Sequence, residues 1–428
     1  MKQGTHDTQT EQQARAVLVS LYTQMDKRNN VNAEGSIQEL VSLAETAGVE
    51  VLEQMTQNRE MPDVRWFIGK GKVEELRILL EALGANTVIF DQELSGAQVR
   101  NLEEHLDAKI IDRTQLILDI FAQRAKTREG ILQVELAQYS YLLPRLSGQG
   151  KNLSRLGGGI GTRGPGESKL ETDRRHIRTR VTDLKRQLEE VMRHRVLYRE
   201  RRKKSGVVQV ALVGYTNAGK STLLKQLTSA DVYVQDQLFA TLDPTSRTLE
   251  LPGGKEIVLT DTVGFIQNLP HDLIAAFRAT LEEVNEADLI LHVVDASSER
   301  RDEQMIVVDE ILQELGAGNK DMVVLYNKSD MCTPDQLEML PSDSTHLRIS
   351  AYNDADLERV SLLIQDQLAG GKRIYRIPAE RGDLISQLYT FSSIVDQEYE
   401  ENEAIFTVEI NKVDYEKFGY KLQDYEVK

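Results

Sequence analysis

The sequence has a single cysteine, Cys332, among its 428 residues. One thiol excludes an internal disulfide and a cysteine-rich metal site, and its place in a loop after a charged motif indicates an incidental thiol. No run of about 18 apolar residues occurs, so we expect no membrane-spanning helix. Met1–Gln13 is polar and lacks an apolar core, so we expect no signal peptide and a cytoplasmic protein.

Basic residues are fewer than acidic ones, 52 against 68, and the formal net charge is −16. Such a balance argues against a nucleic-acid partner unless a local basic region provides the contacts. Residues 145–204 are that exception. They hold 18 Lys and Arg against 7 Asp and Glu, a net charge of +11, which leaves −27 for the rest of the chain.

A strand–loop–helix pattern occupies the middle of the chain. A buried strand, Val207–Val213, precedes the loop and a helix starts at Thr222; the loop itself is Gly214-Tyr215-Thr216-Asn217-Ala218-Gly219-Lys220-Ser221. Glycines let backbone N–H groups turn toward phosphate oxygens, and the helix N-terminus adds positive charge. We expect Lys220 to reach the β- and γ-phosphates and Ser221 to hold Mg²⁺. A chance glycine-rich turn is disfavoured by the intact flanks.

Two later segments predict the other residues of the site that binds the phosphates and Mg²⁺. A strand runs into Asp261-Thr262-Val263-Gly264, where Asp261 would hold Mg²⁺ through a water and the Gly264 N–H would sense the γ-phosphate. A first switch segment is expected at Phe239-Ala240-Thr241-Leu242-Asp243-Pro244-Thr245. Thr241 is our choice for completing the Mg²⁺ coordination, with Thr245 as the other candidate.

The base-binding end follows two continuous apolar runs, Leu289–Val294 and Met322–Tyr326, which are typical of parallel strands buried on both faces. The second run ends in Asn327-Lys328-Ser329-Asp330. The Asp330 carboxylate can accept hydrogen bonds from guanine N1–H and the exocyclic amine, a pair that adenine lacks, while Lys328 would lie on the purine face.

Ser350-Ala351-Tyr352 follows a short strand, where backbone N–H groups can meet the guanine O6. Together the five motifs predict a GTP- and GDP-binding domain of mainly parallel α/β fold over residues 205–371. Its candidate catalytic residues are Lys220, Thr241, Gly264 and Asn217.

Phe265 stands where Ras-type GTPases carry a water-orienting glutamine. A phenyl ring cannot orient water, so we expect slow intrinsic hydrolysis unless another group is supplied. Asn217, at the fourth position of the loop, leaves two interpretations open. It holds a K⁺ beside the phosphates, as Asn does there in related GTPases, or it only closes the loop by hydrogen-bonding its own backbone.

The N-terminal third predicts a small α/β domain. We expect residues 1–35 to be flexible and residues 36–122 to alternate helix and strand, with about four strands. Three of these are expected at 49–52, 87–90 and 109–112, and Ser95 is a candidate N-cap. Gly69-Lys70-Gly71-Lys72 lacks the spacing of a phosphate-binding loop, so a strand–helix turn is favoured there.

Residues 123–204 predict a basic antiparallel helical hairpin. The first helix, about Arg128–Arg145, would use Ile131, Val134, Gln138, Tyr141 and Leu142 as its apolar side. The second has a heptad seam at Ile177, Val181, Leu184, Leu188 and Val191. The tip, 157–166, contains Gly159-x-Gly161-x-x-Gly164 without the strand that a dinucleotide site requires.

The tip is therefore either a flexible linker or an element that enters a crowded polyanionic site. In the second case Arg155, Arg163 and Lys169 would contact RNA phosphates, and the charge of the hairpin favours RNA over a merely solvated face. Residues 372–428 predict a small α/β module with strands at 373–377 and 404–410 and a helix over about 382–399.

The chain resembles the HflX family of ribosome-associated GTPases over about residues 36–370. In addition to the phosphate-binding loop and the two switch segments, matching motifs are Leu269-Pro-His-Asp-Leu273, Gly158-Gly-Gly-Ile-Gly-Thr-Arg-Gly-Pro-Gly-Glu167, Leu170-Glu-Thr-Asp-Arg-Arg175, Ile111-Asp-Arg-Thr114 and Ile120-Phe-Ala-Gln-Arg124. The resemblance implies binding to rRNA of the large (50S) subunit, with a role in ribosome splitting or rescue under stress or in subunit maturation. We expect a monomer and no DNA partner. The alternative is a signalling-type GTPase switch with a protein effector and a purely structural hairpin.

Overall fold

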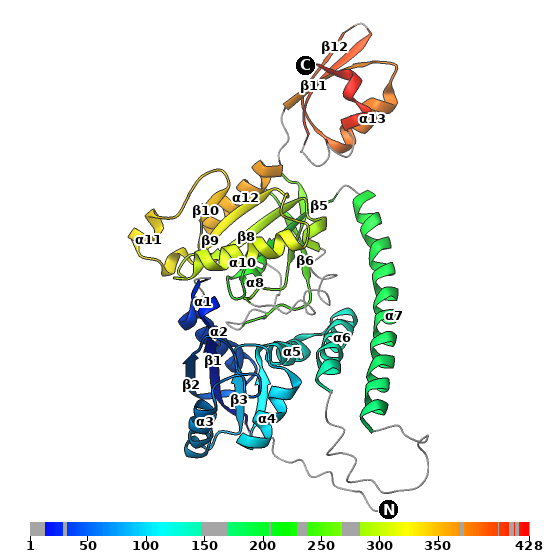
Figure 1. Cartoon of the computed structure of the whole chain (residues 1–428). Helices are drawn as coiled ribbons and strands as arrows, with labels where there is room; N and C mark the ends of the chain where they lie inside the picture. The colour runs from blue at the N-terminus through cyan, green and yellow to red at the C-terminus, as the bar shows by residue number, and fades with distance from the viewer. Residues whose placement is uncertain are drawn as a thin grey trace, which may run out of the picture. The chain divides into compact units, whose positions relative to one another are not determined.

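The computed structural model describes residues 13–28, 32–146, 169–204, 207–228, 238–267, 283–368, 372–400, 402–410, 415 and 419–427 (Figure 1). The chain forms two compact units. The first contains the residues up to Val191 and the segment 236–242, and the second contains most of the remainder, from Met192 to the C-terminus. Among the described residues, no helix combines the length and the apolar character needed to cross a membrane.

The first unit begins with a parallel four-stranded sheet in the order β2-β1-β3-β4. Its strands are β1 (Arg15–Tyr22), β2 (Glu50–Asn58), β3 (Thr87–Phe90) and β4 (Lys109–Asp112). The helices are α1 (Gln24–Arg28), α2 (Ala33–Thr46), α3 (Lys70–Leu83), α4 (Gly96–Leu106) and α5 (Arg113–Arg124). Buried residues of the sheet, α3 and α4 form one apolar core that includes Val19, Leu76 and Leu102.

The expectation of a flexible N-terminus over residues 1–35 is wrong from Arg15 onward, because β1 is a central strand and Ala16–Tyr22 are all buried. The range 36–122 therefore holds three strands rather than four. Ala16-Val17-Leu18-Val19 is apolar on both faces, as a central parallel strand requires, but the polar sequence around it conceals the signal. Met1–Gln12 lie outside the described residues.

The N-terminal ends of two helices that flank this sheet, α3 and α4, are as the sequence predicts. Ser95 caps α4 as expected: its Oγ accepts from the Gln98 N–H (3.3 Å), and its own N–H donates to Gln98 Oε1 (2.9 Å). Gly69 is the N-cap of α3, so Gly69-Lys70-Gly71-Lys72 is a turn into a helix, with Lys70 exposed.

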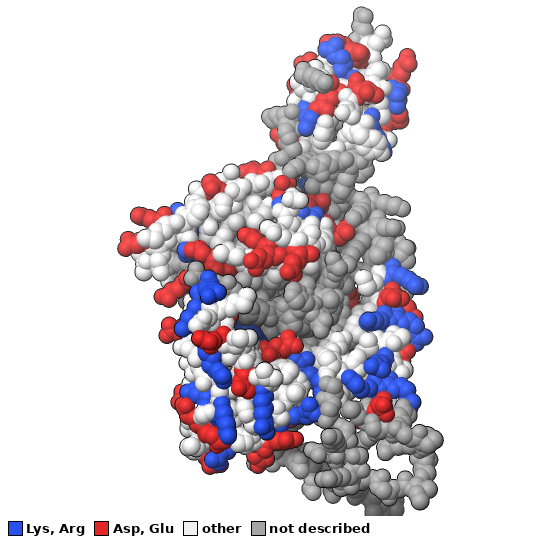
Figure 2. Space-filling view, in the orientation of Figure 1, with Lys and Arg blue, Asp and Glu red and all other residues white. Residues whose placement is uncertain are grey.

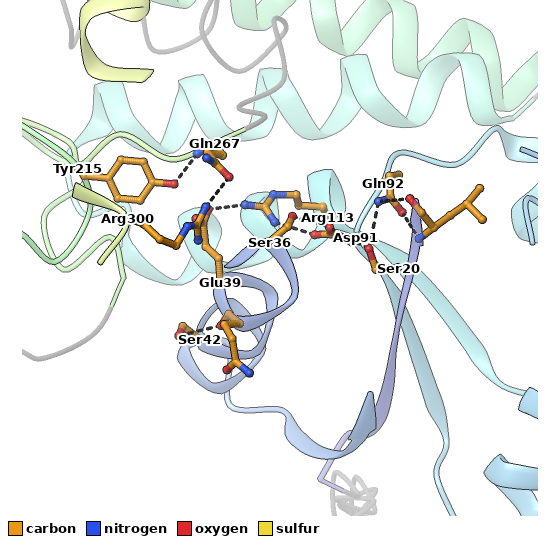
Figure 3. Close-up of polar contacts among 12 residues, drawn as sticks. Ser20, Ser36, Glu39, Ser42, Asp91, Gln92, Arg113, Tyr215, Gln267 and Arg300 are labelled. Carbon is orange, nitrogen blue, oxygen red and sulfur yellow. Dashed lines mark hydrogen bonds and ion pairs between the residues drawn. The ribbon is translucent and has the colours of Figure 1, made fainter. Parts of the chain in front are cut away.

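A buried ionic cluster lies where the central strands end (Figure 3). Arg113 donates from Nη1 to Asp91 Oδ1 (2.8 Å) and from Nη2 to Glu39. Asp91 Oδ2 also accepts from Ser36 Oγ (2.6 Å) and Ser20 Oγ (3.3 Å). Since the three charged side chains are at most 6% exposed, the guanidinium compensates two carboxylates that have little contact with water.

The basic hairpin consists of α6 (Arg128–Arg145) and α7 (Lys169–Lys204), which run antiparallel (Figure 1). The seam of α7 is confirmed where it meets α6: Leu184, Leu188 and Val191 pack against Leu132, Leu136 and Tyr139. The Arg180 guanidinium donates from Nε and Nη2 to Glu135 Oε1 (2.9 and 2.7 Å), which fixes the two helices side by side.

The expected apolar side of α6 is only partly right. Ile131 and Leu142 are 48% and 41% exposed, whereas the helix buries Leu132, Val134 and Ala137. The reason is that α6 packs on α5 as well as on α7, so its buried positions do not follow a single stripe.

The second unit contains a six-stranded sheet in the order β10-β9-β8-β5-β7-β6, in which only the β6–β7 pair is antiparallel. Its strands are β5 (Val208–Val213), β6 (Thr245–Glu250), β7 (Glu256–Asp261), β8 (Leu289–Asp295), β9 (Met322–Asn327) and β10 (His346–Arg348). The helical segments are α8 (Lys220–Thr228), α10 (Arg301–Glu314), η3 (Ser329–Met331), α11 (Pro334–Glu338) and α12 (Asp354–Leu368). This arrangement confirms the expected parallel α/β fold, with the motifs at the carboxyl ends of the strands.

The C-terminal module is an antiparallel sheet in the order β12-β13-β11-β14 with α13 (Gly382–Phe391) packed on it. Its strands are β11 (Lys372–Pro378), β12 (Ser393–Tyr399), β13 (Glu403–Glu409) and β14 (Glu426–Val427), with short 3₁₀ turns η4 (Gly419–Lys421) and η5 (Gln423–Tyr425). The expected helix to Tyr399 is wrong because β12 pairs with β13 from Ser393 onward. The β-branched pair Ile394-Val395 favours a strand there.

The buried ionic cluster yields the first prediction. Arg113→Met should lower the free energy of unfolding by about 3–5 kcal/mol, because it leaves Asp91 and Glu39 buried without their cation. Urea unfolding of the full chain would measure the change. Arg77→Met is the matched control, since Arg77 pairs with Glu74 and Glu81 on an exposed face, and it should cost less than about 1 kcal/mol. Equal effects of the two variants would contradict the assigned role of the cluster.

Candidate functional site

The loop that begins at Gly214 joins the end of β5 to α8 as expected, but α8 starts at Lys220, two residues before the expected Thr222. Its glycines are required by space as well as by backbone angle. A Cβ at Gly214 (φ +151°) would lie 2.1 Å from the Val293 carbonyl oxygen, and one at Gly219 (φ +95°) would lie 2.3 Å from Asn327 Nδ2. Asn217 also has a positive φ, +61°, a conformation that Asn tolerates better than most residues.

Lys220, the first residue of α8, is buried. Its Nζ donates to the carbonyl oxygens of Gly214 (3.1 Å) and Tyr215 (2.9 Å). Burial lowers the pKa of Lys220 to about 8, and the nearby Asp261 carboxylate offsets part of that shift. An anionic phosphate would relieve the cost of burying this ammonium.

Ser221 and Asp261 meet in the structure, since Ser221 Oγ donates to Asp261 Oδ2 at 2.7 Å. A hydroxyl and a carboxylate at this spacing fit the oxygen ligands that Mg²⁺ prefers, one directly and one through water. When bound, Mg²⁺ would offset charge on the β- and γ-phosphate oxygens. The described residues hold no group of three or more His, Cys, Asp or Glu that could bind another metal.

The segment after Asp261 lies against the loop. Thr262 Oγ1 donates to the Leu212 carbonyl (2.7 Å), and Val263 is buried. A Cβ at Gly264 would come within 2.7 Å of Thr216 Cα and 3.2 Å of Lys220 Nζ. Gly264 is therefore beside Lys220, where its N–H could meet a γ-phosphate.

The motifs that are expected to bind the base also meet. Buried Asn327 donates from Nδ2 to the Ala218 carbonyl (2.9 Å) and accepts at Oδ1 from the Ala351 N–H (3.0 Å). It thereby joins the phosphate loop to Ser350-Ala351-Tyr352. Lys328 has φ +61°, and its Nζ forms an ion pair with Asp295 Oδ2 (2.7 Å).

Asp330 follows in η3 and is exposed, and no hydrogen bond to its carboxylate is found among the described residues. Ser329 donates its N–H to the Ile349 carbonyl (3.0 Å), which holds the two base-binding segments together. The carboxylate thus stands in solvent at the edge of the site, where a guanine could reach it.

The expected first switch segment divides between the two units. Phe239, Ala240, Thr241 and Leu242 belong to the first unit, whereas Asp243 and Thr245 belong to the second. Phe239 has φ +53°, is 1% exposed, and packs edge-to-face on Phe121 of α5, with ring centroids 4.7 Å apart. Thr245 begins β6 and pairs with Asp261 across the strands. Thr241 is thus not placed relative to Ser221, and its Mg²⁺ role stays a prediction.

Of the expected RNA contacts, Arg155 and Arg163 lie outside the described residues, and Lys169 is the first residue of α7. Within the basic region 145–204, the structure adds exposed residues of α7 that the sequence did not identify individually. Figure 2 shows Lys and Arg gathered along the described part of α7. Its exposed members, which lie off the apolar seam, are Arg175, Arg178, Lys185, Arg186 and Arg193. The heptad spacing could have revealed this surface, because it defines the opposite face.

Sequence reasoning also missed a polar chain next to the phosphate loop (Figure 3). The Tyr215 hydroxyl accepts from the Gln267 N–H (2.9 Å), and Gln267 Oε1 accepts from Arg300 Nη2 (2.8 Å). Neither Gln267 nor Arg300 stands in a recognisable motif, so no local signal indicates them.

Three protein-family models match the chain: GTP-binding GTPase N-terminal over residues 34–122, GTP-binding GTPase Middle Region over 124–202, and 50S ribosome-binding GTPase over 209–328. The chain is 52% identical over 384 residues to GTPase HflX of Alkalihalophilus pseudofirmus, covering 89% of this chain and 90% of the relative. It is 44% identical to GTPase HflX of Escherichia coli, covering 91% and 92%. A solved GTP-binding protein from the archaeon Sulfolobus solfataricus, in complex with GDP, is 23% identical, with a TM-score of 0.43 over 82% of this chain and 98% of that chain.

A buried histidine below the phosphate loop yields the second prediction. His292 on β8 is 1% exposed, and burial, followed by the charge of Lys220, lowers its pKa to about 4. Between pH 4 and about 6.5 the unfolded chain binds more protons at this site than the folded chain, so the free energy of unfolding falls as pH falls through that window. His292→Leu should remove about 1.4 kcal/mol of the loss between pH 7.5 and 5.5.

Urea unfolding at the two pH values measures this difference. His346→Gln serves as the control, because His346 is partly exposed and contacts Asp343. A pH dependence that His292→Leu leaves unchanged would contradict the prediction.

Proposed function

Because the chain belongs to the HflX family of GTPases, we propose that it hydrolyses GTP while associated with the large ribosomal subunit, and that its basic hairpin contacts rRNA. The GTPase activity follows from the family and from the nucleotide domain. The observation that supports the partner is the match of residues 209–328 to the family model described as 50S ribosome-binding GTPase. Within this proposal the task is ribosome splitting or rescue under stress, or subunit maturation.

We assign the nucleotide contacts as follows. Gly214–Ser221 bind the phosphates, Ser221 and Thr241 hold Mg²⁺, and Asp261 and Gly264 respond to the γ-phosphate. Asn327–Asp330 and Ser350–Tyr352 recognise guanine. The 2.7 Å contact of Ser221 with Asp261 and the Asn327 bridge to Ala218 and Ala351 support this assignment, because they bring four separate motifs to one site.

Hydrolysis by the isolated protein should be slow. Phe265 is 1% exposed, so its ring is turned into the protein and cannot hold a water. The ribosome would order the segment around Thr241 and complete the site beside Phe265, and the large subunit would then act as the activator of the GTPase.

The RNA contact is proposed for the hairpin because its charge differs in sign from the rest of the chain. Residues 145–204 carry +11 in a chain of −16, and the exposed basic side chains of α7 extend this charge along one helix face. Phosphate contacts of this kind give binding that weakens steeply with salt. The tip residues Arg155 and Arg163, with Lys169, would add contacts beyond the helix.

The rival function is a signalling switch in which a protein effector reads the nucleotide state and the hairpin is only structural. In that case ribosome binding would not depend on the charge of the hairpin. We further propose a cytoplasmic monomer, since the proposed partner is the ribosome.

The hairpin charge gives a direct test of the partner. Full-length protein should co-sediment with large subunits in a non-hydrolysable GTP analogue and less so in GDP. Replacing Arg175, Arg178 and Arg186 with Ala should lower the slope of log affinity against log salt by about 2–3, since each phosphate contact contributes about 0.7–0.9. Affinity for GTP should change less than twofold, because these residues lie outside the nucleotide site.

The matched control replaces three exposed basic residues of the C-terminal module, Arg376, Arg381 and Lys421, which keeps the change in net charge the same. Replacing Arg155, Arg163 and Lys169 tests the tip in the same assay. Co-sedimentation that neither hairpin variant alters would favour the signalling switch.

We also propose that Asn217 holds a K⁺ beside the phosphates. The positive φ of Asn217 fits this role and equally fits a residue that only closes the loop. A cation there would offset developing charge as an arginine finger does elsewhere. GTP turnover should be several-fold faster in K⁺ than in Na⁺, and Asn217→Ala should abolish the difference. Equal rates of the unmodified protein in both salts would leave Asn217 with the loop-closing role.

A further inference from the structure

Three hydrogen bonds fasten the segment after Asp261 to the phosphate loop. The Phe265 N–H donates to the Gly214 carbonyl (3.1 Å), and the Thr216 N–H donates to the Phe265 carbonyl (2.8 Å), so that Tyr215 and Phe265 form a parallel bridge. The third bond extends this pairing by two residues, from the Gln267 N–H to the Tyr215 hydroxyl (2.9 Å).

The third bond differs from the other two in what it requires. Backbone pairing is open to residues of any type, but the bond to Gln267 needs an oxygen at the end of an aromatic ring. Tyr215 is 5% exposed and Phe265 is 1% exposed, so both rings are fixed by packing. The phenol oxygen is therefore a rigid acceptor built into the phosphate loop.

Gln267 is held from its other side as well (Figure 3). Its Oε1 accepts from Arg300 Nη2 at 2.8 Å. Arg300 is the residue before α10, where its Nε contacts Glu303 Oε2 (3.1 Å) and its N–H donates to Ser298 Oγ (3.2 Å). The end of the segment is thus fastened to the phosphate loop through its backbone and to the start of α10 through its side chain.

These hydrogen bonds influence the position of Gly264, which directly precedes Phe265. Its backbone lies so close to Thr216 and Lys220 that a Cβ would meet them at 2.7 and 3.2 Å. A displacement of residues 265–267 would shift the Gly264 backbone, and with it the Gly264 N–H, relative to Lys220. A donor aimed at developing charge contributes most when it is already in place, because no reorganisation is then needed during the reaction.

We propose that Tyr215 is a positioning residue for GTP hydrolysis: its hydroxyl, together with Gln267 and Arg300, holds the Gly264 N–H where the γ-phosphate arrives. This inference rests on the proposed role of Gly264. The position after Gly264, which would orient water in Ras-type GTPases, is occupied here by a buried anchor. Hydrolysis then depends on the placement of the main chain more than on a side chain at that position.

Loss of the Tyr215 hydroxyl should affect GTP hydrolysis but not GDP binding, and the reason is the chemistry of the two nucleotides. GDP has no γ-phosphate, so a misplaced Gly264 leaves GDP binding unchanged while it slows the cleavage of GTP. Were the Tyr215 bond merely stabilising, its loss would lower the melting temperature and leave the rate constant of the bound complex unaltered.

The test uses Tyr215→Phe in the full chain, which keeps the ring and removes only the hydroxyl. We expect single-turnover hydrolysis of saturating GTP to fall about tenfold, a part of the 10²–10³-fold effect of removing a donor outright, with the GDP dissociation constant within about twofold. Gln267→Met should give a smaller loss, and Tyr215→Phe combined with Arg300→Met should lose less than the product of the single effects, because both act on one segment.

Arg301→Met is the matched control, since Arg301 contacts Asp302 and the Ala296 carbonyl instead of Gln267, and it should hydrolyse GTP at the normal rate. An unchanged rate for Tyr215→Phe, or a fall in GDP affinity in step with the rate, would overturn the inference. Gly264→Ala tests the proposed role of Gly264 separately from the role of Tyr215. If this variant neither slows hydrolysis nor weakens the preference for GTP over GDP, the proposed role of Gly264 is wrong.

Discussion

The burial of the Lys220 ammonium is the constraint on which the nucleotide site depends. A charged group in the protein interior is costly unless it is paired and hydrogen-bonded. Here it contacts two carbonyl oxygens of its own loop, with the Asp261 carboxylate close enough to raise its pKa. The loop can curl around the lysine only because Gly214 and Gly219 leave room for Val293 and Asn327. Phosphate binding would supply the counter-charge that the folded protein itself provides only in part.

Around that lysine, separate strand ends converge through a few fixed bonds. Asn327 joins the phosphate loop to the base-binding segment, and Ser221 joins it to Asp261. The pairing of Tyr215 with Phe265 adds the segment that would respond to the γ-phosphate. Each of these links involves the loop itself, so the loop is their common point. In the first unit, Phe239 packs on Phe121 of α5, so part of the expected switch segment is anchored by the core of that unit.

The sequence predicts the nucleotide domain well because its motifs are local: each is a few residues at the end of an apolar run, and Gly214–Ser221 needs no tertiary information. It predicts less where tertiary packing decides. β1 is a short apolar run in polar surroundings, and only pairing with β2 and β3 makes it central. β12 carries residues acceptable to a helix, and its pairing with β13 makes it a strand. Gln267 and Arg300 are 33 positions apart, so no pattern within either segment could indicate their contact.

The rate of GTP hydrolysis as a function of large-subunit concentration tests the central claim most directly. Under the proposed function the isolated chain is a slow GTPase whose site is completed on the ribosome, because Phe265 leaves the attacking water without a side chain to orient it. Turnover should therefore be slow for the protein alone and should rise by orders of magnitude to a plateau as large subunits are added. A fast rate without ribosomes, or a rate that stays flat across the titration, would contradict it.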